Sequence, residues 1–197
     1  PVTAYGAGDI PVLVNGGFET WVGTVPDGWV KSVSPPISKQ TNQYQAGAAS
    51  IGGLIANSLS TTAITLTQVL GHNGCFSTLP QLTFTCYFRV NAVAQVTNAK
   101  VAVLLNDAEV ASTTRNLQTD GANVWVQVSV SYTPANWNDA NEIKVQSSLV
   151  KTVAEQYDFW IDTAAISYSG QAYQGTAAVM GTPYQTIEYA SGLYLIT

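Results

Sequence analysis

Few residues in this 197-residue sequence have the types and spacing that catalysis requires. The single histidine, His72, stands in Gly71-His72-Asn73-Gly74, a stretch whose composition is typical of a turn. A zinc site or a Ser-His-Asp triad needs further histidines or an acid-rich cluster, which the neighbouring sequence does not offer. We therefore interpret His72 as a surface turn residue.

Glycoside hydrolysis requires two carboxyl groups that face each other across a cleft. Four acids stand in strand-like segments, namely Glu109, Glu142, Asp158 and Asp162. They belong to separate segments, and nothing in the sequence pairs them. No glycine-rich phosphate loop follows a strand and opens a helix either. The sequence therefore predicts a protein that is not an enzyme.

The two cysteines, Cys75 and Cys86, lack the basic neighbours that would lower the pKa of a thiol. Two cysteines are too few for a disulfide framework, although a single bridge between them remains an alternative. Free cysteine is among the most buried residue types. We favour Cys86 as a small core residue of an apolar strand.

Composition narrows the class of protein. Hydrophobic residues make up 46% and charged residues 10% of the chain, against roughly 25% charged residues in an average soluble domain. The net charge is −5 and no basic run exists, so we expect no nucleic-acid partner. The sequence has no stretch of 18 apolar residues, so we expect no membrane-spanning helix. The start at Pro1 has no signal-peptide pattern. Either a signal was removed before residue 1 or there was none, and the second alternative favours a protein made and assembled in the cytosol.

Short apolar runs separated by glycine, proline and polar residues predict an all-β fold. We expect a two-sheet antiparallel jelly-roll β-sandwich over residues 12–169, because this many strands call for two packed sheets. An extended segment, 1–11, precedes it, and an extension or added edge strand, 170–197, follows. Asn106-Asp107 predicts a hairpin turn. The expected strands are 12–14, 29–33, 48–54, 63–70, 81–90, 100–105, 109–114, 124–132, 142–148 and 157–168.

A set of short motifs then occurs in a characteristic order along the chain. The segments are 15–19 (NGGFE), 26–29 (PDGW), 49–51, 82–88, 125–130, 141–145 and 159–162. In this order they resemble the jelly-roll carbohydrate-binding modules that are appended to xylanases and cellulases. The resemblance spans residues 12 to about 168. Related jelly rolls also occur in phage virion proteins, where they decorate capsids or tails.

The resemblance implies a structural Ca²⁺ near the first strand. Its ligands would be Glu19, backbone carbonyls around Asn15 and Gly17, Ser50, and the acid of the last strand, Asp162. Hard cations prefer such oxygen ligands. The alternative is that backbone N–H groups, or a lysine such as Lys144, satisfy the two carboxylates. The family often has two consecutive acids in the last strand, whereas here Thr163 follows Asp162.

Sugars present apolar C–H faces to aromatic rings, so exposed aromatic residues are candidate ligand contacts. We predict Trp137, in a polar loop, together with Trp21 and Tyr44. The alternative for Trp137 is a cap on the edge of the sandwich. The apolar contexts of Trp29, Trp125 and Trp160 favour core positions.

The C-terminal segment is rich in tyrosine, which protein interfaces favour. We predict Tyr184, Tyr189 and Tyr194 as interface residues that add an edge strand to a neighbouring chain. The alternative is that this segment completes the sheet of its own domain.

We therefore expect a non-catalytic, carbohydrate-module-like virion decoration protein, with glycan binding as a further role. Its partners would be capsid or tail proteins, sister copies or a polysaccharide, and its location the virion surface. The alternative is a secreted, extracellular carbohydrate-binding module of a glycoside hydrolase.

Overall fold

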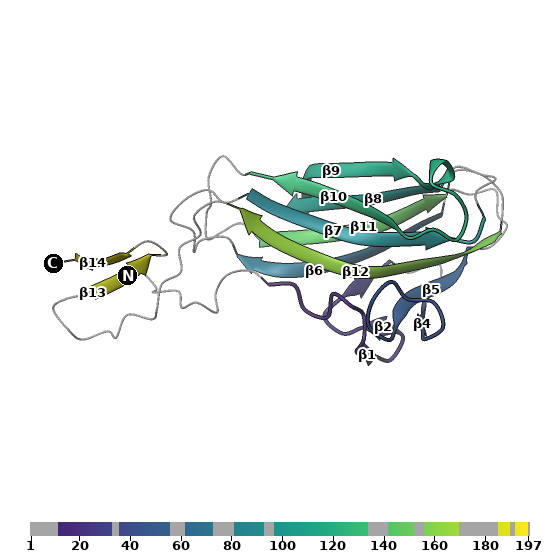
Figure 1. Ribbon diagram of the computed structural model, residues 1–197, viewed down its shortest axis with the longest axis horizontal. Coiled ribbons are helices and arrows are strands. Elements are labelled where there is room, and N and C mark those ends of the chain that lie inside the picture. The colour runs from purple at the N-terminus through teal and green to yellow at the C-terminus, as the bar shows by residue number, and fades with distance from the viewer. Residues whose placement is uncertain are drawn as a thin grey trace.

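The computed structural model describes residues 12–32, 36–55, 62–72, 81–92, 97–133, 142–151, 156–169, 185–189 and 192–196. The expected extension 1–11 lies outside these residues. Within them, the chain forms two five-stranded antiparallel sheets, which confirms the predicted β-sandwich. No helix in the described residues is long and apolar enough to cross a membrane. Figure 1 shows the long strands of the two sheets lying over one another.

The first sheet has the strand order β10-β7-β12-β5-β4. Its strands are β10 (Val126–Tyr132), β7 (Gln81–Val90), β12 (Tyr157–Ser169), β5 (Ser50–Ile55) and β4 (Ser38–Gln40). The second sheet has the order β3-β6-β11-β8-β9. Its strands are β3 (Val30–Lys31), β6 (Thr62–His72), β11 (Glu142–Lys151), β8 (Thr97–Leu105) and β9 (Ala108–Asn116).

Strand β7 shows how the sequence pattern produces the sandwich. Its bounds agree with the predicted segment, and its even-numbered residues from Leu82 to Val90 are all buried. Odd-numbered residues such as Thr85 and Arg89 face outward, because successive side chains of a strand point to opposite faces. Cys86 is therefore a core residue, as predicted, and burial raises the pKa of its thiol. Cys75 lies outside the described residues.

The predicted hairpin turn joins β8 and β9. Asn106 and Asp107 have φ angles of 49° and 66°. Two consecutive positive φ angles are what a type I′ turn needs, and asparagine and aspartate tolerate them well. At one edge of the molecule β9 and β10, from different sheets, lie close together (Figure 1).

The predicted strand at 12–14 does not form. Instead, the side chain of Gln68 takes the place of a partner strand: its Nε2 donates to the Val14 carbonyl at 2.8 Å, and its Oε1 accepts from the Val14 N–H at 2.7 Å. Strand β6 also continues through Gly71 and His72, which we predicted as a turn. Gly71 has a φ of 128° beside a β-bulge, which explains the turn-like composition.

Two further pairs of short strands and one 3₁₀ turn belong to the described structure. Strands β1 (Trp21–Val22) and β2 (Val25–Pro26) form a two-stranded ladder near the first motif. Strands β13 (Gln185–Tyr189) and β14 (Gly192–Ile196) form a separate two-stranded sheet, beyond the end of the sandwich in Figure 1. A 3₁₀ turn, Leu117–Thr119, follows β9.

Candidate functional site

Asp162 is a buried carboxylate on the outward side of β12. Its exposed fraction is 0%, because the loop of residues 41–49 folds over it. The backbone N–H groups of Gln45 and Ala46 donate to Oδ2 at 2.7 and 3.2 Å, and that of Thr163 donates to Oδ1 at 2.6 Å. Burial raises the pKa of Asp162, and these three donors oppose the rise.

Glu19 anchors the other half of the same loop. Its Oε1 accepts the N–H groups of Ala48 and Ala49 at 2.8 and 3.2 Å. A Cβ atom at Gly47, whose φ is +76°, would stand 2.0 Å from that oxygen, so the turn requires glycine. The charge of Glu19 also raises the pKa of Asp162, which shows that the two acids are close enough to repel each other.

The first motif forms a closed turn against β12. Asn15 has a φ of 51°, and its Nδ2 donates to the carbonyls of Thr20 and Asp27 at 2.8 and 3.1 Å. Gly16 lies so close to β12 that a Cβ atom would stand 2.1 Å from the Ala164 carbonyl oxygen. The Gly16 carbonyl accepts the Ala164 N–H at 2.8 Å. The asparagine and glycine of the motif thus have structural roles in holding Glu19 in place.

The structure brings most of the predicted calcium ligands into one region. Ser50 is buried at the end of the same loop, and its Oγ donates to the Gln43 carbonyl at 2.5 Å. Gly17 lies beside the Glu19 side chain. These oxygens are of the kind that Ca²⁺ prefers. However, the five N–H groups on the two carboxylates would repel a cation on the side that they occupy, so the donor set fits a metal only in part.

Backbone N–H groups thus donate to both Glu19 and Asp162. This was one of the two alternatives to a metal ion that the sequence left open. Lys144, the other partner considered, lies on the second sheet, where its Nζ contacts Asp107 and Glu142. Calcium itself stays a prediction.

The predicted aromatic ligand contacts lie in different surroundings. Trp21 is half-buried on β1, and its indole N–H donates to the Phe18 carbonyl at 2.8 Å. Tyr44 is 46% exposed on the loop of residues 41–49. Trp137 lies outside the described residues. Trp29 belongs to the core, as predicted, and its ring centre lies 5.1 Å from that of Phe18.

Trp125 and Trp160 differ from the expectation, because both are half-buried on the outward side and flank Arg89. The guanidinium carbon of Arg89 lies 5.2 Å from the Trp160 ring centre and 6.0 Å from that of Trp125. Its Nη1 donates to Gln43 Oε1, and its Nη2 donates to Asn123 Oδ1 at 3.2 Å. The outward parity of residue 89 in the alternating strand was a signal for this cluster that our sequence reasoning did not use.

We call the outward side of the first sheet, with the loop of residues 41–49 on it, the covered face. The outward side of the second sheet we call the polar face. Its strands present hydroxyl, amide and charged side chains, together with the exposed side chains of Val30 and Val69. Gln146 Nε2 donates to Thr67 Oγ1 at 3.1 Å, and Lys100 Nζ contacts Glu109 Oε2 at 2.6 Å. These partners come from neighbouring strands of the same sheet.

Outward-facing residues between these polar side chains are nearly inaccessible. Ala102 is 1% exposed, Ser148 5% and Leu104 9%. All three share the outward parity of Lys144 and Gln146, with which Leu104 and Ala102 are paired in register. The longer polar side chains therefore cover these three residues and form the accessible surface around them.

The four acids considered for hydrolysis have separate partners. Glu109 pairs with Lys100 and Glu142 with Lys144, whereas Asp158 accepts from Asn91 Nδ2 at 2.9 Å. Asp162 holds the loop on the covered face. Within the described residues, no three His, Cys, Asp or Glu side chains form a group that could hold a metal ion. The described structure thus brings no two of these acids into a facing pair.

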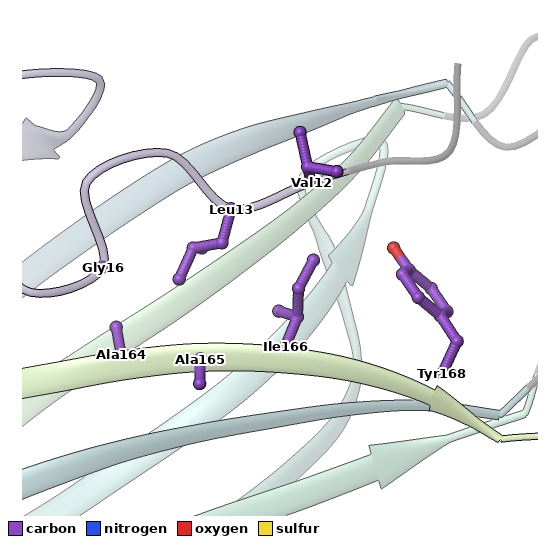
Figure 2. A pocket seen from close by; sticks show the side chains of 7 residues that line it. All are labelled: Val12, Leu13, Gly16, Ala164, Ala165, Ile166 and Tyr168. Carbon is purple, nitrogen blue, oxygen red and sulfur yellow. The ribbon is translucent and has the colours of Figure 1, made fainter. Parts of the chain in front are cut away.

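A separate apolar pocket of about 430 Å³ lies between the N-terminal segment and the end of β12. Figure 2 shows Leu13 and Ile166 on opposite sides of it, with Tyr168 toward one end. The lining is Val12, Leu13, Gly16, Ala164, Ala165, Ile166 and Tyr168. This lining contains no acid, base or nucleophile suited to catalysis, and Leu13, Ile166 and Tyr168 also pack against the core.

No family model matches the sequence, and no curated protein matches it either. Solved structures do share the fold. A carbohydrate-binding module, TmCBM61, in complex with β-1,4-galactotriose has a TM-score of 0.57 and 13% identity, covering 80% of this chain and 98% of that one. A cyclase from Fischerella sp. TAU has a TM-score of 0.57 and 13% identity, covering 79% and 94%.

An arabinose-bound α-L-arabinofuranosidase, MgGH51, also has a TM-score of 0.57, at 11% identity over 80% of this chain. The chain spans 26% of the length of that enzyme. Carbohydrate-binding modules and enzymes thus both occur among the structural neighbours. At these identities the likeness establishes the β-sandwich fold and leaves function to be argued from the residues.

Proposed function

We propose that this protein is a non-catalytic, glycan-binding β-sandwich whose binding surface is the polar face. The observation that carries the proposal is the layer of polar side chains, among them Lys144 and Gln146, that covers Ala102, Leu104 and Ser148. Sugar hydroxyls both donate and accept hydrogen bonds, so they suit a surface that mixes amides, hydroxyls and paired charges. The structural likeness to carbohydrate-binding modules supports this choice of ligand.

The charged residues of this face are already in ion pairs. Lys100 lies with Glu109, and Lys144 lies with Asp107 and Glu142. The carboxylates raise the pKa of Lys144, and Lys100 lowers that of Glu109. Lys144 and Glu109 are therefore both charged at neutral pH, and Glu109 is not poised to donate a proton to a leaving group. This supports binding rather than hydrolysis.

Aromatic stacking would come from Trp137. It lies in the segment between β10 and β11, and β11 is the central strand of the polar face. The test is an array of plant, algal and bacterial glycans, with β-1,4-galactotriose as one probe, followed by calorimetry on whichever glycan binds. We expect Gln146→Ala and Trp137→Ala each to weaken binding at least tenfold. Gln127→Ala, on the outward side of β10, is the matched control and should leave affinity unchanged.

A protein that binds none of these glycans, or whose affinity is unaffected by both substitutions, would contradict the proposal. A structural Ca²⁺ at Glu19 and Asp162 is part of the same proposal. Added calcium should then raise the melting temperature of the wild type and leave that of Glu19→Gln unchanged.

The separate hairpin of β13 and β14 favours a second candidate function, assembly. An isolated two-stranded sheet is at best marginally stable in water, so a neighbouring chain would stabilise it. The role would be that of a virion decoration or tail-surface protein, located on the virion surface and bound to capsid or tail proteins or sister copies. Sedimentation velocity of the full chain over a concentration series tests self-assembly, and Tyr189→Lys combined with Tyr194→Lys should abolish it. A monomer at every concentration would count against sister copies as partners.

A further inference from the structure

Arg89 is a cation whose charge is not matched by an acid in the described part of the chain. The four ion pairs found there involve Lys100, Arg115 and Lys144. Both Nη atoms of Arg89 donate instead to neutral amide oxygens, those of Gln43 and Asn123. These amides orient the guanidinium without neutralising it.

The Nε atom of Arg89 strengthens this point. It is buried and has no hydrogen-bond partner in the described structure. A buried donor without an acceptor destabilises a fold, and native structures keep few of them. Arg89 as a whole is half-buried, and it lies on the outward side of β7. Arg89 thus keeps part of its surface open to solvent on the covered face.

Two indole rings stand beside this cation. Trp125 and Trp160 flank the guanidinium, and both are half-buried. The Trp160 ring lies over β5 at Gly52, where a Cβ atom would stand 3.0 Å from Trp160 Cδ1. Glycine thus makes room for the ring. The cluster therefore combines aromatic surface, a planar cation and amide groups within one region of the covered face.

We propose that the Arg89 cluster is a second binding site, which accepts the carboxylate-bearing sugar of an acidic glycan such as a uronic acid. The guanidinium fork matches the geometry of a carboxylate. The indole rings suit the C–H face of the sugar, and the amides of Gln43 and Asn123 suit its hydroxyls. A long polyanion is disfavoured because the protein carries a net charge of −5.

This site lies on the opposite side of the sandwich from the polar face, so it does not depend on the function proposed above. The probe is α-1,4-trigalacturonate, and the control ligand is α-1,4-galactotriose, which carries a neutral CH₂OH group in place of each carboxylate. Binding is followed through the indole N–H signals of Trp125 and Trp160 in ¹H–¹⁵N spectra, assigned with Trp125→Phe and Trp160→Phe.

We expect trigalacturonate to shift both indole signals, with an affinity that falls severalfold when salt is raised from 50 to about 200 mM. Arg89→Gln should weaken this binding at least tenfold, and Arg89→Lys should weaken it less. Arg115→Gln removes an exposed guanidinium that pairs with Asp120 and belongs to neither proposed site. It is the matched control and should stay within twofold of the wild type.

The proposal is overturned if trigalacturonate leaves the indole signals unmoved, or if Arg89→Gln binds it as well as the wild type does. It is also overturned if α-1,4-galactotriose shifts the same two signals with equal affinity. This last comparison uses the wild-type protein, so it decides the matter even if Arg89→Gln does not fold. Loss of β-1,4-galactotriose binding in Gln146→Ala, by contrast, reports only on the polar face.

Discussion

The two outward faces of the sandwich treat carboxylates in opposite ways. On the covered face, burial raises the pKa of Asp162, which accepts three backbone N–H groups under a loop. On the polar face, Lys100 lowers the pKa of Glu109, whose side chain is 41% exposed. The first carboxylate fixes the course of the chain, whereas the second only pairs with a neighbouring strand. The covered face thus uses a buried carboxylate to hold a loop, whereas the polar face keeps its paired charges at the surface.

The largest effect should follow from Asp162→Ala. Three backbone N–H groups, of Gln45, Ala46 and Thr163, would lose their acceptor in a buried setting. We expect the free energy of unfolding to fall by about 3 kcal/mol, measured by urea denaturation. The matched control is Asp158→Ala, which removes a partly exposed carboxylate bonded to Asn91 and should cost about 1 kcal/mol. Equal losses in the two variants would remove the distinction between buried and surface acids.

A second test targets the loop itself. At Gly47→Ala a methyl group would meet Glu19 Oε1 in a backbone conformation with φ +76°. We expect a loss of about 2 kcal/mol. Gly23→Ala is a matched control, because Gly23 also has a positive φ of +61° but nothing within 4 Å of the added atom. It should cost about 1 kcal/mol through backbone strain alone, and the excess at Gly47 measures the contact with Glu19.

The third test uses pH. The pKa of Asp162 is raised above its ordinary 3.8 in the folded state, so its contribution to stability is full below pH 3.8 and is lost as pH rises through the raised pKa. The difference in stability between the wild type and Asp162→Asn should therefore shrink from acid to neutral pH. Melting temperatures of both proteins, in buffer with a chelator, provide the measurement.

If the wild type instead gained stability over Asp162→Asn as pH rises, the predicted direction would be wrong. Such a gain in added calcium alone would indicate a bound cation, which lowers the pKa of its ligands. For Glu109→Gln the sign reverses, because the pKa of Glu109 is lowered. The stability that Glu109 contributes is present above its ordinary pKa and is lost as pH falls through the lowered one.

The smallest effect concerns the surface pair of Lys100 and Glu109. Both side chains are about one-third exposed, at 30% and 41%, so solvent screens their interaction. A double-mutant cycle with Lys100→Met and Glu109→Gln should give a coupling of about 0.5 kcal/mol that weakens in salt. A coupling as large as the loss at Asp162→Ala would make the polar face a structural element like the covered one.

Much of the fold could be predicted from local patterns. The alternation in β7 and β10 specified which residues are buried, and Asn106-Asp107 specified the hairpin between β8 and β9. Residues 12–14 were predicted wrongly as a strand, because a side chain of β6, Gln68, supplies both hydrogen bonds that a partner strand would have made. Such long-range pairing leaves no periodic signal near residue 14.

The candidate sites were less accessible to prediction. The resemblance singled out Glu19 and Asp162, and in the structure both side chains accept hydrogen bonds from the loop of residues 41–49. The family-based set of ligands did not include the N–H groups of that loop, which do hold the two acids. Trp125 and Trp160 were assigned to the core from their apolar neighbours. A tryptophan in an apolar strand can face either way, and only the register of β12 against β7 places Trp160 beside Arg89.

The sequence by itself determined the all-β class, the two-layer arrangement and the burial of one side of each long strand, because side-chain alternation is a local property of strands. Only the tertiary structure decided which outward side is covered and which stays open. That choice depends on where the loop of residues 41–49 meets Asp162, more than 100 residues further along the chain. Hydrogen bonds over such separations arise from the packed fold and have no counterpart in local sequence.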